Sequence, residues 1–148
     1  MRPRGMTLIE MVVVVMLVAA MSAALAVSIG GGGEGRQLRE AARELTAQLQ
    51  YTRGVAMLQG EPQVFEVDVD ARAWRAPGNR AGTLPRGLEV AVLSARGEST
   101  DADTAGIRFF PDGSSTGGVV RLGSGEAQWR VEVAWLTGSV TLGRGDPP

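Results

Sequence analysis

The sequence predicts an α+β protein in which a long N-terminal helix, apolar in its first half and amphipathic in its second, packs on an antiparallel head of two β-sheets. An apolar run fills roughly the first thirty residues, and a stripe of apolar residues at helical spacing follows it. Short stretches of alternating pattern, separated by glycine-rich turns, occupy the remainder of the 148 residues. A chain of this length has room for one domain and a membrane segment.

Composition excludes several classes of function. The chain contains 15 arginines and 16 acidic residues, with no lysine, histidine or cysteine. Without cysteine there is no disulfide, zinc–thiolate site or cysteine nucleophile, and without histidine the usual general base is missing. The net charge of −1 provides no basic field for general nucleic-acid binding. We therefore expect a protein that is not an enzyme and needs no cofactor.

The apolar segment 6–29 is expected to be a transmembrane helix. As a helix it would rise roughly 36 Å, enough to cross the ~30 Å hydrocarbon core of a bilayer. Arg2 and Arg4 precede the segment and, apart from one glutamate inside it, no charge follows until Glu34. The positive-inside rule then keeps the N-terminus in the cytoplasm and exports the rest. The alternative is a secretory signal peptide cut near Ala24-Leu25-Ala26.

Glu10 is the unusual residue of this segment. A charge at mid-membrane costs ~2.5–3.5 kcal/mol, less near the edge, so the acid argues against an ordinary signal peptide and calls for a cationic partner. If the chain were cut between Gly5 and Met6, the new amino terminus would lie four residues before Glu10, about 6 Å along a helix. The carboxylate could then neutralise its own amine, or that of a neighbouring subunit displaced by about one turn.

The stretch Arg4–Met11, with the apolar run behind it, resembles the class III signal of type IV pilins and type II secretion pseudopilins. The resemblance implies that residues 1–5 are a leader, that prepilin peptidase cleaves after Gly5, and that the enzyme N-methylates Met6. It also implies that Glu10 is the glutamate needed for assembly. Phenylalanine is usual at the position of Met6, which is a mild departure from the family pattern.

Residues 30–35 read GGGGEG and predict a glycine-rich hinge. Each glycine inside a helix costs about 0.5–1 kcal/mol relative to alanine, so this run should break or soften the helix. A plain flexible linker is the alternative, and the sequence does not separate the two.

Helical periodicity resumes over residues 36–59. Small and apolar residues recur at spacings of four and three and so share one face: Leu38, Ala42, Leu45, Leu49, Thr52 and Ala56. Most charged residues lie off this stripe, and Gly60 is a natural stop. We expect the stripe to pack on a sheet, and Gly54 to be a close-packing site within the helix.

Residues 62–142 are expected to form the β-rich part of the head, followed by a tail over 143–148. Period-two alternation and turn residues place strands at 63–70, 73–74, 88–92, 107–110, 119–122, 129–135 and 139–142. The cluster Pro111–Ser115 is expected to be a turn, because proline presets φ and glycine accepts a positive φ.

Three stretches of the head are similar to the H-type minor pseudopilin domain of type II secretion, namely 41–60, 107–118 and 131–142. The resemblance implies a minor pseudopilin that forms the tip of the pseudopilus and primes its polymerisation. The implied partners are prepilin peptidase, other minor and major pseudopilins, the inner-membrane assembly platform and the exported protein. The implied location is the bacterial inner membrane, single-pass with a periplasmic head, and then the periplasmic pseudopilus.

Minor type IV pilins of the FimU and FimT kind share this domain, so a role in pilus assembly or DNA uptake is the competing hypothesis. DNA uptake needs arginines gathered on one exposed surface of the head. The candidates are Arg72, Arg75, Arg80, Arg86 and Arg96, which lie in a region expected to be rich in loops. Because acidic residues nearly balance the head overall, nucleic-acid binding is not expected.

Two aspartate pairs are the candidate metal ligands. Asp68 and Asp70 would share the exposed face of a strand, and Asp101 and Asp103 lie in a polar loop. Neither pair has the ligand count of a calcium site, so no metal site is expected. The tripeptide Arg144–Asp146 matches an integrin-binding motif, for which chance is a sufficient explanation.

Overall fold

The computed structural model describes residues 8–30, 32–94 and 104–145, with side chains described over 8–22, 33–93 and 105–145. The chain divides into two compact units, residues 1–33 and 34–148. Each unit is described by itself. We refer to the second as the head.

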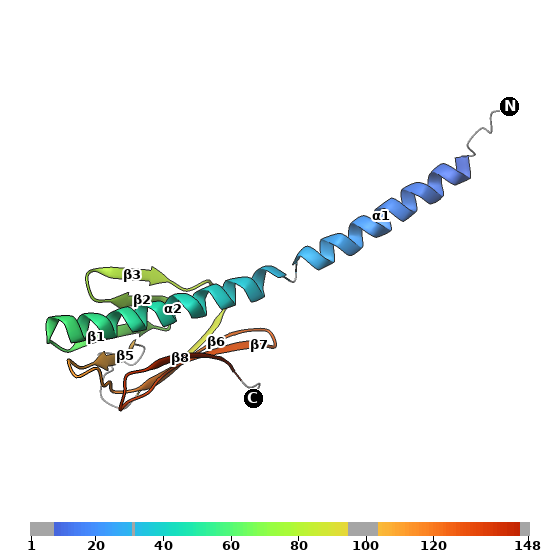
Figure 1. Cartoon of the computed structure of the whole chain (residues 1–148). Coiled ribbons are helices and arrows are strands. Elements are labelled where there is room, and N and C mark those ends of the chain that lie inside the picture. The colour runs from blue at the N-terminus through green and yellow to red at the C-terminus, as the bar shows by residue number, and fades with distance from the viewer. Residues whose placement is uncertain (1–7, 31, 95–103, 146–148) are drawn as a thin grey trace. The chain divides into compact units, whose positions relative to one another are not determined.

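The first unit contains helix α1 (Leu8–Gly30), drawn in blue in Figure 1. All of its side chains that the structure describes are exposed. No helix in the described ranges is both long and apolar enough to span a membrane. The predicted membrane segment begins at residue 6, which lies outside the described residues, as do the side chains of 23–29. The membrane span over 6–29 stays a prediction.

The head contains helix α2 (Gly32–Gln59) from Glu34 onward, and the buried face of this helix is the predicted stripe. All six residues of the stripe, from Leu38 to Ala56, are fully buried, which confirms the periodicity. The helix starts four residues before the expected Arg36, so Gly32, Gly33 and Gly35 lie in its first turn although each glycine in a helix is unfavourable relative to alanine. Gly60 ends it with a φ of +69° and an N–H donated to the carbonyl of Ala56. Gly31 lies outside the described residues, so the expected hinge is not tested there.

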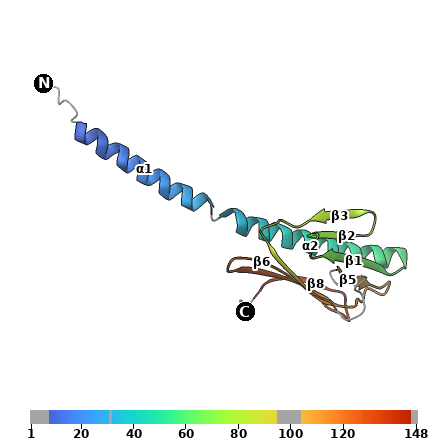
Figure 2. The same ribbon diagram turned by 180° about the vertical axis from the view of Figure 1, so that it is seen from behind.

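In the described part of the head, α2 is joined by two four-stranded antiparallel sheets, as predicted (Figures 1 and 2). The first has the order β3-β2-β1-β5, formed by β1 (Gln63–Asp68), β2 (Ala73–Ala76), β3 (Arg80–Thr83) and β5 (Thr104–Phe109). The second has the order β4-β6-β7-β8, formed by β4 (Glu89–Ser94), β6 (Gly118–Ser124), β7 (Ala127–Val133) and β8 (Val140–Arg144).

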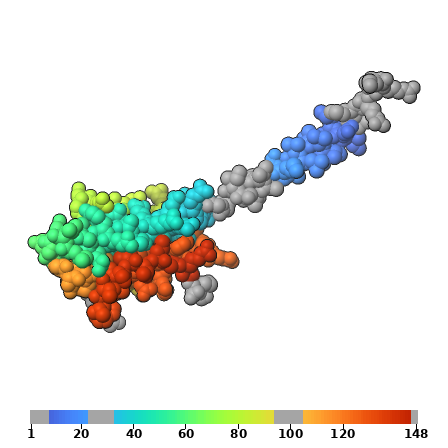
Figure 3. All heavy atoms as spheres, viewed as in Figure 1, coloured from blue at the N-terminus to red at the C-terminus, as the bar shows by residue number. Residues whose placement is uncertain are grey.

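The core forms where the buried face of α2 meets inward side chains of both sheets. The first sheet contributes Phe65, Val67, Trp74, Ile107 and Phe109, and the second contributes Val120, Leu122, Val131 and Val133. Phe65 and Trp74 stack with ring centroids 5.9 Å apart. In Figure 3, α2 runs along the head with β3 on one side of it and β8 on the other. Because all of these core residues lie within the head, the head has a core of its own.

Strand β3 was not predicted, and its region was wrongly expected to be loop. The segment Arg80–Thr83 has no alternation of apolar and polar residues, because its place in the sheet depends on backbone pairing with β2. Gly82 lies so close to the indole of Trp74 that a Cβ there would approach ring atoms within 2.5–2.7 Å. A glycine that weakens the strand signal is therefore what allows the strand to pack against Trp74.

Most strand bounds differ from the expectation by one to three residues, and two strands end two residues early. β1 ends at Asp68 instead of residue 70, because the Asp68 carboxylate accepts a hydrogen bond of 2.7 Å from the N–H of Ala71 and starts a turn. β7 ends at Val133, and Trp135, expected to continue the alternation, lies in the following turn with 69% of its surface exposed. The N–H of Gly138 bonds the carbonyl of Ala134, which closes that turn.

Candidate functional site

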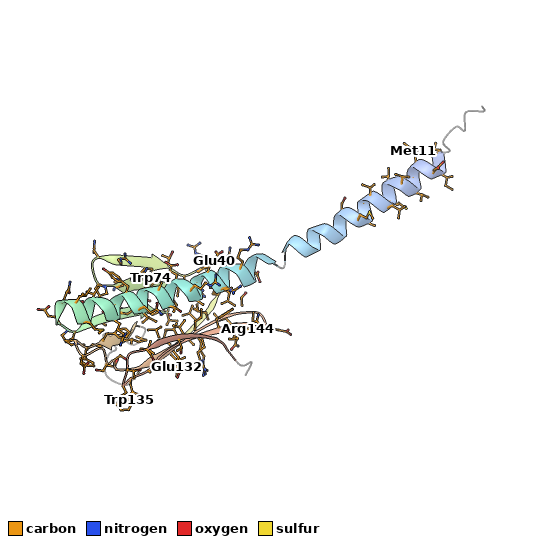
Figure 4. All side chains as sticks on the ribbon, in the orientation of Figure 1. Met11, Glu40, Trp74, Glu132, Trp135 and Arg144 are labelled. Atoms are coloured by element: carbon orange, nitrogen blue, oxygen red, sulfur yellow. The ribbon has the colours of Figure 1, made fainter. Side chains whose placement is uncertain are left out.

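Glu10 lies in the first turn of α1 and is exposed. The residues that share its face at helical spacing are Val13, Val14 and Leu17, all of them apolar and exposed. Figure 4 shows side chains of this helix and labels Met11, the residue that follows Glu10. A carboxylate thus sits at the beginning of an apolar surface. Exposure of such a surface to water is unfavourable, so lipid or other helices are expected to cover it.

Gly5 and Met6, the predicted cleavage and methylation residues, lie outside the described residues. Their roles stay predictions that depend on the sequence. Glu10 is the one member of the predicted set that the structure places, and it follows Met6 by four residues in the sequence.

In the head, Arg53 joins three segments that are distant in the sequence. From the last third of α2, its Nε donates to the carbonyl of Gly113 at 3.0 Å, and one Nη donates to the carbonyl of Thr137 at 3.0 Å. These partners belong to the turns after β5 and β7, two of the stretches that carry the sequence resemblance. Arg53 therefore fixes both turns to the helix. Sequence reasoning did not find this role, because 60 and 84 residues separate the partners.

The two turns also touch each other at Gly138. This residue has a φ of +59°, and a Cβ there would collide with the carbonyl of Gly113. The same added Cβ would lie only 3.0 Å from Arg53 Nε. Only glycine allows this approach of the two turns beneath the guanidinium.

Asp112 orders the turn that Arg53 binds. Its carboxylate accepts hydrogen bonds from the Ser114 hydroxyl at 2.6 Å and the Ser114 N–H at 2.9 Å. These bonds, the hydroxyl first, lower the pKa of Asp112 below its ordinary value of 3.8. The predicted turn over Pro111–Ser115 is confirmed, with Gly113 at a φ of +84°.

The described residues contain no group of three or more acidic side chains that could hold a metal ion. Asp68 closes the turn after β1, and Asp70 is exposed beyond the strand. The pair Asp101 and Asp103 lies outside the described residues, as does Asp146 of the Arg144–Asp146 tripeptide.

The arginines proposed for DNA contact are largely engaged within the head. Arg72 donates to the carbonyls of Pro85 and Leu88, and Arg75 lies 3.5 Å from the Glu66 carboxylate. Arg80, now placed in β3, stacks over the Tyr51 ring with its guanidinium carbon 4.0 Å from the centroid, and it donates to Gln48. Arg86 is exposed, and Arg96 lies outside the described residues.

Comparison with known proteins gives matches over most of the chain. The family described as "Type II transport protein GspH" matches residues 41–138, and the "Prokaryotic N-terminal methylation motif" matches residues 1–26. The chain is 44% identical over 140 residues to the type II secretion system protein H of Xanthomonas campestris, covering 95% of this chain and 83% of that protein.

Two solved structures share the fold. The minor pseudopilin EpsH of Vibrio cholerae superposes with a TM-score of 0.59 at 19% identity, over 78% of this chain and all of that one. The type IV minor pilin FimU of Pseudomonas aeruginosa superposes with a TM-score of 0.57 at 17% identity, over 77% of this chain and 96% of that one.

Proposed function

The chain belongs to the GspH family as a minor pseudopilin of the type II secretion system, and we propose that Glu10 brings it into the pseudopilus by pairing with the amine of an adjacent subunit. The family membership confirms both resemblances stated from the sequence. It also implies anchoring in the inner membrane, processing by prepilin peptidase and assembly with other pseudopilins. The family is one of structural subunits.

The proposed mechanism is assembly without catalysis. Cleavage after Gly5 removes Arg2 and Arg4, which leaves thirteen arginines against sixteen acidic residues and a side-chain charge of −3. The amine created at Met6 stays cationic after methylation. Glu10 is the only acidic residue in the segment 6–29. Its carboxylate in the apolar surface of α1 is then the counter-charge for the amine of a neighbouring subunit. A charge that is costly alone in lipid fixes the axial position of the neighbour when it is paired.

We further propose a single-pass orientation with a cytoplasmic N-terminus and a periplasmic head. In the assembled state the subunit lies at the tip of the pseudopilus, where it primes polymerisation and contacts the exported protein. The inner-membrane assembly platform is the partner that receives it before assembly. The exposed position of Glu10 among apolar side chains is the observation that supports this function.

Processing and assembly are tested with Gly5→Ala and Glu10→Ala. Gly5→Ala should leave the precursor uncut, which mass spectrometry of the N-terminus measures. Glu10→Ala should be inserted, cut and methylated at Met6, yet co-purify with other minor pseudopilins at least about tenfold less, since a neighbour's amine loses its counter-charge in lipid. Glu40→Ala is the matched control, because Glu40 is an exposed acid on α2 (Figure 4) and should leave assembly unchanged.

Two results would contradict the proposal. A Gly5→Ala chain that still begins at methylated Met6 would refute the cleavage site, and Glu10→Ala with full co-purification would refute the pairing role. Glu10→Asp separates charge from shape, because the shorter carboxylate keeps the charge and should recover part of the assembly that Glu10→Ala loses.

A further inference from the structure

The head carries a cleft of about 780 Å³ that the assembly mechanism does not use. It lies between the first turns of α2, the turn joining β6 to β7, and the end of β8. Its lining consists of Gly35, Arg36 and Arg39 from α2, the segment 126–129, and Arg144 with Gly145. Figure 4 shows Arg144 at the edge of the head. All of these residues belong to one unit.

Arginines gather around a single indole in this cleft. The guanidinium carbons of Arg39 and Arg144 lie 5.8 Å and 6.0 Å from the ring centroid of Trp129, which is half-buried. Trp129 and Arg144 are paired across β7 and β8, so their side chains share a face of the sheet. Arg36 precedes Arg39 by three residues and therefore lies on the same side of α2.

Little in the described part of the head neutralises these cations. Among the described lining residues Glu126 is the one acid, and nearby Glu34 accepts a weak hydrogen bond of 3.4 Å from Ser124. Among the described residues, no carboxylate lies within 4.0 Å of the guanidinium groups of Arg36, Arg39 or Arg144. All three are exposed. A net positive cleft on a chain of net negative charge indicates an anionic ligand.

The position of these arginines in the sequence favours one source of that anion. Arg36 follows Gly30 by six residues, a length that even a fully extended chain spans in roughly 20 Å. The headgroup layer of a bilayer is itself several ångströms thick. If segment 6–29 is inserted as proposed above, Arg36 stays within roughly 20 Å of the end of the membrane segment, and this reach includes the lipid surface. Arginine and tryptophan are also the side chains that anchor proteins at this interface.

We propose that the cleft around Trp129 binds the phosphate headgroups of anionic lipid where the chain leaves the membrane. The inference rests on the proposed membrane insertion. The indole lies at the level of the headgroups and the three guanidinium groups hold their phosphates. This contact keeps the head of the unassembled subunit at the periplasmic surface, and extraction into the pseudopilus breaks it.

The test uses the full mature chain in vesicles of phosphatidylcholine, with part of the lipid replaced by brominated phosphatidylglycerol or brominated phosphatidylcholine. In a Trp135→Phe background, quenching reports Trp129, because Trp74 is buried. Brominated phosphatidylglycerol should quench Trp129 more strongly than brominated phosphatidylcholine does, and salt should weaken the difference. Arg36→Gln and Arg39→Gln should each weaken the association of the cleft with phosphatidylglycerol about fivefold. This factor corresponds to about 1 kcal/mol per arginine. Arg130→Gln, an exposed arginine that pairs with Glu132 at 3.5 Å, is the control and should change nothing.

The outcomes separate this inference from the function it rests on. Failure of the chain to float with vesicles would refute membrane insertion itself. Flotation without any preference for phosphatidylglycerol at Trp129 would overturn the lipid assignment alone. A response of Trp129 to an acidic peptide, duplex DNA or inorganic phosphate, with no preference among lipids, would also overturn it and would assign the cleft to that ligand.

Discussion

At the scale of single residues, Arg53 shows how much of the head depends on contacts that the sequence does not reveal. The buried stripe of α2 was predictable, because each of its members follows the last by one helical turn. Arg53 lies off that stripe, and its acceptors, Gly113 and Thr137, are set by how the two sheets close on the helix. The prediction that Trp135 continues β7 is wrong, because an alternating pattern does not show where a strand ends.

Removing the Arg53 side chain should destabilise the head. Arg53→Ala loses two charged hydrogen bonds, one of them to the carbonyl of the buried Gly113, and should lower the free energy of unfolding by about 2 kcal/mol. Arg53→Lys should recover part of this, because an ammonium group cannot reach both carbonyls in the same geometry. Arg43→Ala, at an exposed position of the same helix, is the control. Urea unfolding measures all three, and equal midpoints for Arg53→Ala and Arg43→Ala would contradict the role.

Asp112 should make stability depend on pH. Its pKa is lowered in the folded head, first by the Ser114 hydroxyl and then by the Ser114 N–H, so the ionised form contributes stability above the ordinary pKa. That contribution is lost as the pH falls from about 4 through the lower folded pKa. Thermal melts of wild type and Asp112→Asn should therefore differ at neutral pH and converge in acid. Asp70→Asn, an exposed acid beyond β1, is the control. A difference that is constant with pH would refute the assignment.

At the scale of elements, the sequence predicts those whose signal is periodic burial. The helix α2 and strands β1, β4, β5, β6 and β8 follow from such patterns, and β7 follows up to its end. β3 carries no such pattern, because a glycine must lie under Trp74. The one cue was the Gly78-Asn79 pair, which adopts positive φ at both residues in the turn from β2 to β3.

Gly54 corrects the expectation of close packing inside α2. A Cβ at this position would meet nothing within 4 Å, so the glycine only weakens the helix. Gly54→Ala should therefore stabilise the head by about 0.5–1 kcal/mol, which corresponds to a rise in melting temperature of about 3 °C. Gly138→Ala is the opposite case and should lower the melting temperature. Alanine is strained at the positive φ of this position, and its Cβ would collide with the Gly113 carbonyl. Calorimetry of the two variants measures both, and a fall for Gly54→Ala would show that the helix needs its glycine.

At the scale of the whole molecule, the assembly residues and the fold of the head differ in what predicts them. Glu10 could be found from the sequence, because an acid in a long apolar segment stands out wherever the chain folds. The architecture of two sheets on one helix was also predictable, from turn residues and alternation. The cleft around Trp129 was not, because it joins residues 36, 129 and 144, which only the folded topology brings together.

Charge at this scale predicts that the head does not bind duplex DNA. Residues 34–148 carry thirteen arginines and fifteen acidic residues, and three of the five arginines proposed for DNA contact are engaged within the head. A gel shift of this fragment, which contains the whole core, should show no complex even at low salt.

Glu40→Arg with Glu44→Arg is the control for sensitivity. It adds two cations beside Arg43 on the exposed side of α2, and it should produce binding that disappears as salt rises. A cooperative thermal melt of both fragments shows that they are folded. A salt-dependent shift of the unaltered head would favour the type IV pilin role in DNA uptake over secretion.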